Sequence, residues 1–457
     1  MRFQDIWGLR LMDYGAISLL PTALVLCLAI WSHRTLESVV AGSILAFVIM
    51  DGWSFADRLA AVTTEVLMEE TTAWVILVCA LYGSFIALLV KGGGSYAFGE
   101  ALTRRLGSKR GSLLATWVLG LFIFLDDYLN SLTVGATMKA VTDRFRVSRE
   151  MLAYVVDSTA APMCLLIPIS SWGVFFGGLL EKNAVAAQGE GINMILAAIP
   201  YMFYPLLALV IVPLVIVGVV PLMGPLKRAE QRAEASGDLG IFEDDALTVE
   251  PATHSRTSVF FLPMIALLGF TIFPEVDLLR GVILGISFTL VQYLVFGIMP
   301  AGELFDTCIE GLKSMVPVLS MLLALFVFVE ANNAIGLTDY VIAGVEPYMT
   351  AALLPVLIFI TMSVVSYTTG SNWGVIAIAM PVAFPLAQAM EVNMLLVVGA
   401  LLSASGFGSH ACFYSDSTVL SAQGAGCRTY DHALTQLPYA LLAAVLAAVF
   451  YLVVALA

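Results

Sequence analysis

The sequence predicts an all-helical polytopic membrane protein built from two inverted repeats, and three observations support this. Of the 457 residues, 60% are hydrophobic and 12% are charged, whereas soluble proteins are about half apolar and about a quarter charged. Apolar stretches long enough to cross a bilayer recur along the chain. Lys and Arg gather at three places in the first half and are absent from Ser314 to Cys427 in the second. We therefore expect the lipid bilayer to be the solvent of most side chains.

Several classes of protein are disfavoured by the same composition. The formal net charge of -13 argues against a nucleic-acid partner. The six cysteines form no CxxC pair, which disfavours a disulfide scaffold or a zinc site. The first residues lack the short apolar core and small-residue cleavage site of a removable signal peptide. We expect no cofactor and no enzymatic activity.

The first repeat is expected to span residues 1–223. Its positive clusters belong in the cytoplasm, where short loops collect Lys and Arg. Residues 111–138 lie between two such clusters and are too long for one span but too short for two, which predicts a re-entrant hairpin. Its polar tip could not face lipid. Residues 151–181 are too long for one regular helix and carry Pro162 and Pro168 in their middle, which predicts a broken helix. A charged cytoplasmic linker, 224–258, follows.

The second repeat, 259–457, is expected to have the opposite orientation. Between Ser314 and Cys427 its loops carry Asp339, Glu346 and Glu391 but no Lys or Arg, so these loops should be extracytoplasmic, as should the C-terminus. A second hairpin is predicted at 350–390 and a second broken helix at 393–427. We match Asp157-Ser158-Thr159 in the first broken helix with Asp416-Ser417-Thr418 in the second. Each repeat also has an amphipathic stretch before its core helix, and we expect five crossings per repeat.

Two opposed hairpins with broken helices are a transporter architecture in which substrate and ions bind where the repeats meet. A membrane enzyme or a receptor is the alternative. Ionisable side chains at membrane depth are costly and usually functional, and the candidates here are Asp126, Asp127, Asp157, Asp416 and Glu330. Their segments lack neutralising Lys or Arg, so bound cations or protons are the natural compensation. Competition between proton and cation for buried carboxylates would give antiport.

Each candidate also has a structural interpretation. One of Asp126 and Asp127 could cap the returning hairpin arm, and Asp157 and Asp416 could be N-caps of half-helices. Glu330 could sit at the extracellular interface. His410, the only histidine expected at membrane depth, could be packed or could relay protons. The polar residues of the hairpin tips could hold turns through side-chain hydrogen bonds: Asn130, Ser131, Thr133, Ser371 and Asn372. The aromatic residues could be packed in the core or could form a cage for an organic cation: Tyr128, Trp172, Tyr367, Trp373, Phe413 and Tyr414.

Three blocks resemble the NhaC family of sodium/proton antiporters: Phe124 to Gly173, Gly370 to Ala387 and Ser415 to Ala440. The resemblance implies a fold of paired hairpins and broken helices, and it places motif positions at Asp127, Asn130, Asp157, Ser171, Asn372 and Asp416. Family members usually have an acidic residue just before the histidine and a Pro-containing stretch before the second triplet. This chain has Ser409 before His410, and Phe413 and Tyr414 before the triplet.

The leading hypothesis is therefore a sodium/proton antiporter of a bacterial-type inner membrane. Asp127, Asp157 and Asp416 would hold sodium or a proton, and the hydroxyls of four further residues would complete the coordination: Ser158, Thr159, Ser417 and Thr418. Relatives of the family also exchange organic acids or amino acids, so an ion-coupled exchanger of a small organic solute is the second hypothesis. A channel or receptor is the third. The resemblance also implies a possible homodimer.

Overall fold

The part of the chain that the computed structural model describes is all-helical, with helices joined by short turns and loops and with no β-strand. That part comprises residues 14–32, 34–94, 97, 104, 106–124, 127–168, 170–183, 185–241, 258–273, 277–345, 348, 350–370 and 373–456. Six of its helices are long and apolar enough to cross a membrane, and the bent pair Gly191–Tyr201 and Phe203–Val217 would make a seventh. The prediction of an all-helical, multi-pass membrane protein is confirmed.

The helices fall into two consecutive sets. The first set comprises η2 (Gly15–Leu19), α1 (Leu20–Ser32), α2 (Thr35–Asp51), η3 (Gly52–Ser54), α3 (Phe55–Met68), α4 (Glu70–Lys91), α6 (Lys109–Phe122), α7 (Asp127–Arg144), α8 (Arg149–Thr159), α9 (Ala161–Leu166), α10 (Ser171–Lys182), α11 (Gly191–Ala198), η4 (Ile199–Tyr201), α12 (Phe203–Val217) and α13 (Gly224–Ser236). The second set comprises α14 (Ser258–Ile272), α15 (Leu278–Val295), α16 (Ala301–Ser314), α17 (Val316–Ile335), α18 (Leu337–Val345), α19 (Leu354–Thr369), α20 (Trp373–Ala389), α21 (Met394–Ala411), α22 (Asp416–Ala425) and α23 (Thr429–Leu456).

Helix starts in the second set follow those in the first at a nearly constant interval. The interval is 245 or 246 residues for five successive pairs: Phe55 and Ala301, Glu70 and Val316, Lys109 and Leu354, Asp127 and Trp373, and Arg149 and Met394. The packing is reciprocal as well, because α2 packs on α17 as α15 packs on α4, and α12 packs on α21 as α23 packs on α8. Such reciprocity is expected of two structural repeats. Their inverted relation stays a prediction.

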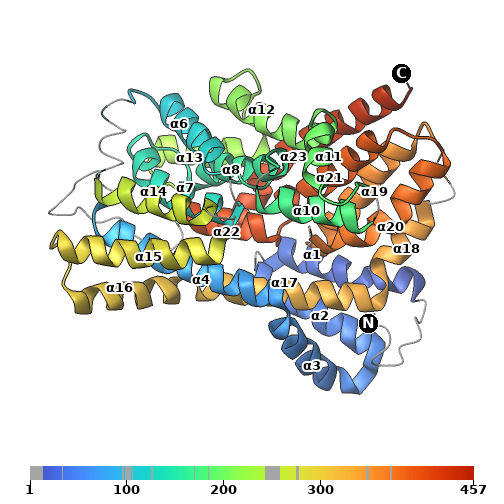
Figure 1. Cartoon of the computed structure of the whole chain (residues 1–457), viewed down its shortest axis with the longest axis horizontal. Coiled ribbons are helices and arrows are strands. Elements are labelled where there is room, and N and C mark those ends of the chain that lie inside the picture. Colours follow the sequence, from blue (N-terminus) through green and yellow to red (C-terminus); the bar gives the residue numbers. More distant parts are fainter. Residues whose placement is uncertain are drawn as a thin grey trace.

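Helix breaks lie inside each of the four segments that were expected to be interrupted. The range 111–138 contains the junction of α6 and α7, and 350–390 contains that of α19 and α20. The range 151–181 contains α8, α9 and most of α10, and 393–427 contains α21 and α22. In Figure 1, α22 lies at the centre of the molecule, and it packs against α7, α8 and α23.

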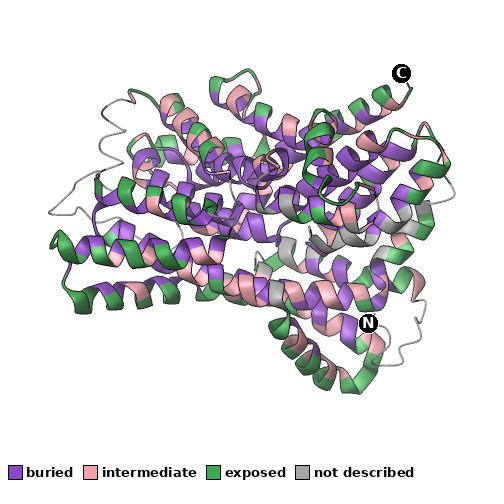
Figure 2. Cartoon of the chain, in the orientation of Figure 1, coloured by how far each residue is buried: buried purple, intermediate pink, exposed green. Residues whose placement is uncertain are grey.

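Burial separates this centre from the periphery. Figure 2 shows α7, α8 and α22 almost wholly buried, whereas α15, α16 and α23 expose one face. The exposed faces of α15 and α23 carry large apolar side chains, such as Val291 and Val295 on α15 and Val445 and Val453 on α23. Apolar faces of this kind suit contact with lipid.

The contact between α7 and α22 is a close approach of two backbones. A Cβ atom on Gly424 would overlap the carbonyl oxygen of Ser131, and one on Gly135 would lie 2.5 Å from the carbonyl carbon of Gly424. Both glycines are therefore required by packing rather than by a left-handed backbone conformation.

Gly424→Ala is expected to lower the thermal unfolding temperature in detergent, because overpacking a tight contact costs about 1–3 kcal/mol. Gly178→Ala on α10 is the matched control, since no heavy atom lies within 4 Å of the position of its Cβ. Intrinsic fluorescence during heating measures both variants. Equal unfolding temperatures for the two variants would contradict this description of the α7–α22 contact.

Candidate functional site

Asp157 lies at the centre of a network that joins α8, α22 and α23. Its carboxylate is fully buried. Oδ1 accepts a hydrogen bond from Ser417 Oγ at 2.5 Å, and Oδ2 accepts one from Gln436 Nε2 at 2.7 Å. His432 Nε2 lies 3.0 Å from the same Oδ2. Within the described part of the chain, His432 is the only basic side chain in contact with Asp157.

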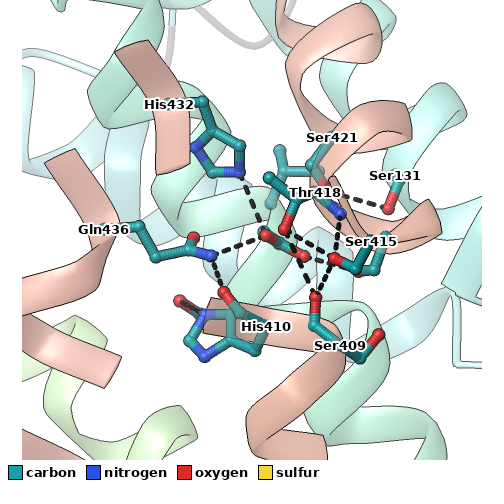
Figure 3. A network of polar contacts seen from close by, with 12 residues as sticks. Ser131, Ser409, His410, Ser415, Thr418, Ser421, His432 and Gln436 are labelled. Carbon is teal, nitrogen blue, oxygen red and sulfur yellow. Dashed lines mark hydrogen bonds and ion pairs between the residues drawn. The ribbon is translucent and has the colours of Figure 1, made fainter. Parts of the chain in front are cut away.

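Figure 3 shows how this network is assembled. His432 and Gln436 approach from α23 on one side, and Ser415, the N-cap of α22, and Thr418 on α22 lie on the other. Gln436 Nε2 also donates to the backbone carbonyl of His410 at the end of α21. One amide group thus links the buried carboxylate to the end of the helix that precedes the second break.

Asp416 and Asp127 are the first residues of α22 and α7, and both are buried. Asp416 Oδ2 accepts a hydrogen bond from Tyr128 OH at 2.7 Å, and its Oδ1 accepts one from the backbone N–H of Ser417 at 2.8 Å. Asp127 Oδ1 accepts one from Trp172 Nε1 at 2.9 Å. The two aromatic residues Tyr128 and Trp172 are therefore donors to candidate carboxylates.

The three aspartates do not form one compact cluster in this state. Among the described residues, no three His, Cys, Asp or Glu side chains gather closely enough to hold a metal ion together. Ser417 instead connects two of them, because its hydroxyl donates to Asp157 and its backbone N–H donates to Asp416. The prediction that these aspartates alternate between a proton and sodium is not tested by this geometry.

His410, in the last turn of α21, is buried and uses both ring nitrogens. Nδ1 lies 2.6 Å from Tyr204 OH, and Nε2 lies 2.9 Å from Ser158 Oγ. A packed, hydrogen-bonded histidine was one of the two interpretations, and these contacts support it. They also place a continuous polar chain from Tyr204 on α12 to the residue after Asp157.

Asn130 holds the first hairpin against the first broken helix. Its Nδ2 lies within hydrogen-bond distance of three carbonyl oxygens: Gly120 at 2.7 Å, Ile123 at 2.9 Å and Thr159 at 2.9 Å. These carbonyls come from the end of α6, the break after it and the end of α8. Within the described residues, Asn130 Oδ1 has no hydrogen-bond partner and is buried. Asn130 therefore supports turns, as one interpretation proposed, and also presents a buried oxygen.

Some of the remaining candidates have described contacts, and the others lie outside the described part of the chain. Thr159 Oγ1 donates to a carbonyl of α8, and Thr418 Oγ1 donates across the second break to Ser409 O on α21. Tyr414 OH donates to Thr368 O, and Glu330 Oε1 accepts from Asn333 on its own helix. Asp126, Ser371 and Asn372 lie outside the described residues, as do the side chains of Ser171 and Trp373.

The two Asp-Ser-Thr triplets are not structural counterparts, contrary to the prediction. Asp157 lies at the end of α8, before its break, whereas Asp416 begins α22, after its break. The counterparts are Ser170 and Ser415, which are the N-caps of α10 and α22. Each serine hydroxyl donates to a carbonyl six residues earlier and accepts from the N–H three residues later. Neither aspartate is therefore an N-cap.

Sequence reasoning missed His432 and Gln436. His410 was expected to be the only histidine at membrane depth, but His432 is also fully buried, within the candidate span Thr429–Leu456. Both missed residues lie in the block Ser415 to Ala440, four residues apart on α23. A polar pair at this spacing shares one helix face, and this was the available signal.

Comparison with known proteins identifies the family of this chain. A family model described as the Na+/H+ antiporter family matches residues 163–456, which is more than half of the chain. An uncharacterized protein of Haemophilus influenzae is 27% identical over 487 residues, covering 98% of this chain and 92% of that protein. The matched region includes α21 to α23 and hence His410, Asp416, His432 and Gln436. The chain belongs to the Na+/H+ antiporter family, of the NhaC type that its motifs resemble.

Proposed function

We propose that this protein is a secondary antiporter that exchanges sodium, or another monovalent cation, for protons across a cytoplasmic membrane. Membership of the family supports cation/proton exchange in general. The observation that supports this site is the position of Asp157, a fully buried carboxylate on α8 that is bonded by side chains of α22 and α23. A single carboxylate thus connects the two sets of helices.

The chemistry of exchange follows from the cost of burying a charge. An ionised carboxylate loses its water shell on burial and needs compensation from donors, a proton or a cation. The hydroxyl and amide donors to Asp157 and Asp416 stabilise a carboxylate without carrying a positive charge of their own, and His432 beside Asp157 is itself able to take up a proton. A proton and a sodium ion would then compete for the same oxygens, and binding of one would release the other.

The proposed cation ligands are oxygens, which hard cations prefer. Asp157 and Asp416 would supply charge together with Asp127, and Ser417 would lie between the first two. The side-chain carbonyls of Asn130 and Gln436 are additional candidates, because neither oxygen has a hydrogen-bond partner among the described residues and both are buried.

The positions of the helix breaks support alternating access. The repeated helix starts and reciprocal packing support two inverted repeats, whose relative rocking would open the site to either side. In the proposed topology the linker faces the cytoplasm and the C-terminus lies outside. The homodimer implied by the resemblance stays a prediction.

Exchange of a small organic solute has less support. The aromatic residues that were expected to form a cage include Tyr128 and Trp172, and both donate hydrogen bonds to carboxylates. That arrangement fixes the carboxylates and turns the polar atoms of these rings toward them. We therefore treat exchange of an organic solute as a possible result of the transport assay and do not propose it as a second function.

The test is exchange in proteoliposomes that contain a pH-sensitive dye and receive an imposed sodium gradient. Wild-type protein is expected to move protons against sodium, and Asp157→Asn and Asp416→Asn to lower the rate at least ~10-fold, because each removes a buried charge that the cation requires. Asp339→Asn, at an exposed position of α18, is the charge-matched control. Absence of proton movement with sodium, lithium and potassium would contradict the proposed cation/proton exchange.

Ser417→Ala is expected to lower sodium/proton exchange at least ~10-fold. It removes the hydrogen bond to Asp157, and a bond to a charged group is worth ~1.5–3 kcal/mol. Ser421→Ala is the matched control one turn later on α22, since its hydroxyl contacts the neutral Ser131 Oγ at 2.9 Å. The same assay measures both variants. An equal loss in the two would mean that packing of α22, and not the bond to Asp157, determines the rate.

A further inference from the structure

The linker between the two helix sets is docked against the helix that carries Asp157. The helix α13 (Gly224–Ser236) is followed by residues 237–240, which return toward the start of α8. We call α13 together with 237–240 the linker latch. A charged linker is ordinarily a solvated connection, but Leu226, Glu230 and Ala233 of α13 are buried.

The linker latch satisfies backbone groups that α8 cannot satisfy by itself. The first N–H groups of a helix have no partner within the helix. Glu230 Oε1 accepts a hydrogen bond from the N–H of Ser148 at 2.8 Å, and the carbonyl oxygen of Leu239 accepts one from the N–H of Arg149 at 2.8 Å. Two successive backbone donors at the start of α8 are thus bonded to the latch.

Two ion pairs reinforce this contact. Glu230 Oε2 lies 2.5 Å from Lys109 Nζ at the start of α6, and Arg232 NH2 lies 2.8 and 2.9 Å from the two carboxylate oxygens of Glu150 on α8. The side chains of Glu150 and Glu230 are each only 4% exposed. Removing one partner from a buried ion pair leaves an uncompensated charge and is strongly destabilising, so detachment of the latch is costly.

Lys109 stays charged in this position. Burial lowers the pKa of Lys109, but the hydrogen bonds and negative charges of Glu230 and Glu234 more than offset this and raise it above its usual value. The cation that joins the latch to α6 is therefore present throughout the physiological pH range.

The helix that the latch holds is bonded to α22 at both of its ends. Arg149 donates from its guanidinium to the carbonyl oxygen of Ala425, at the end of α22, at 3.0 Å. At the other end, Asp157 accepts from Ser417, in the first turn of α22. The two helices therefore run antiparallel, and Asp157 lies ~12 Å along α8 from Arg149 at about 1.5 Å per residue. A shift at the start of α8 would be transmitted to its carboxylate.

We propose that the linker latch is a conformational lock that holds the α8–α22 pair in the observed arrangement, with Glu230 as the positioning residue. When the latch is bonded, Asp157 is held beside Ser417, His432 and Gln436; when it detaches, α8 is released to move. The effect of the latch on sodium/proton exchange rests on the proposed function, whereas its effect on the backbone of α8 does not.

Hydrogen–deuterium exchange of the full-length protein in detergent tests the lock directly. Glu230→Ala is expected to speed exchange at the amides of Ser148 and Arg149 at least ~10-fold, equivalent to ~1.4 kcal/mol. Glu234→Ala is the matched control, because Glu234 also contacts Lys109 but its side chain is 62% exposed. The control should change these amides less than ~2-fold. Equal effects of the two variants, or acceleration spread evenly over the helices, would overturn the proposal.

A second variant covers the case in which Glu230→Ala does not fold. Arg232→Lys keeps the charge but loses the guanidinium group that reaches both oxygens of Glu150. It is expected to speed exchange at the same amides about threefold. Unchanged exchange in this variant would contradict the lock.

Transport gives a separate readout. Glu230→Ala is expected to raise the sodium concentration for half-maximal exchange at least threefold, with Glu234→Ala as the control. Faster amide exchange with unchanged sodium dependence would refute the positioning of Asp157 by the latch. Absence of sodium/proton exchange in wild-type protein would count against the proposed function alone, since the amide result would stand.

Discussion

Burial of the Asp157 carboxylate is the constraint on which the site depends. A charge removed from water in a membrane protein must be compensated inside the protein. The compensation comes from donors on two other helices, Ser417 on α22 and His432 and Gln436 on α23. These three helices cannot move independently without breaking bonds to the carboxylate. Their relative positions are thus coupled through this one carboxylate.

Broken helices impose a second requirement, because backbone groups that leave a helix at membrane depth have no water to bond with. Asn130 meets it for the first hairpin by contacting carbonyls of both neighbouring segments. Ser170 and Ser415 meet it for the two broken helices by capping the helix that follows each break. The polar residues of the breaks therefore serve the backbone first, and only part of their bonding capacity is left for an ion.

The same two constraints explain what the sequence could and could not predict. Runs of polar residues inside apolar stretches cannot face lipid, and prolines among them remove helix hydrogen bonds, so the positions of the four interrupted segments were predictable. The partners of Asp157 were harder to find, because His432 and Gln436 lie on α23, a helix that otherwise reads as an ordinary span. The docking of α13 could not be predicted either, because its many charged residues are typical of a solvated linker. Only the structure shows that Glu230 of α13 and Glu150 of α8 are buried.

The helix positions recur in the two sets of helices, but the positions of the buried aspartates do not. The interval of 245 residues that relates Ser170 to Ser415 pairs Asp416 with Ser171 and Asp157 with Leu402. The identical Asp-Ser-Thr triplets therefore occupy different places in the two repeats, one before a break and one after. Because α8 and α22 run antiparallel, this offset brings the triplets together, with Ser417 bonded to Asp157. The asymmetry of the two triplets thus leaves Ser417 between two buried aspartates, with its hydroxyl bonded to Asp157 and its backbone N–H bonded to Asp416.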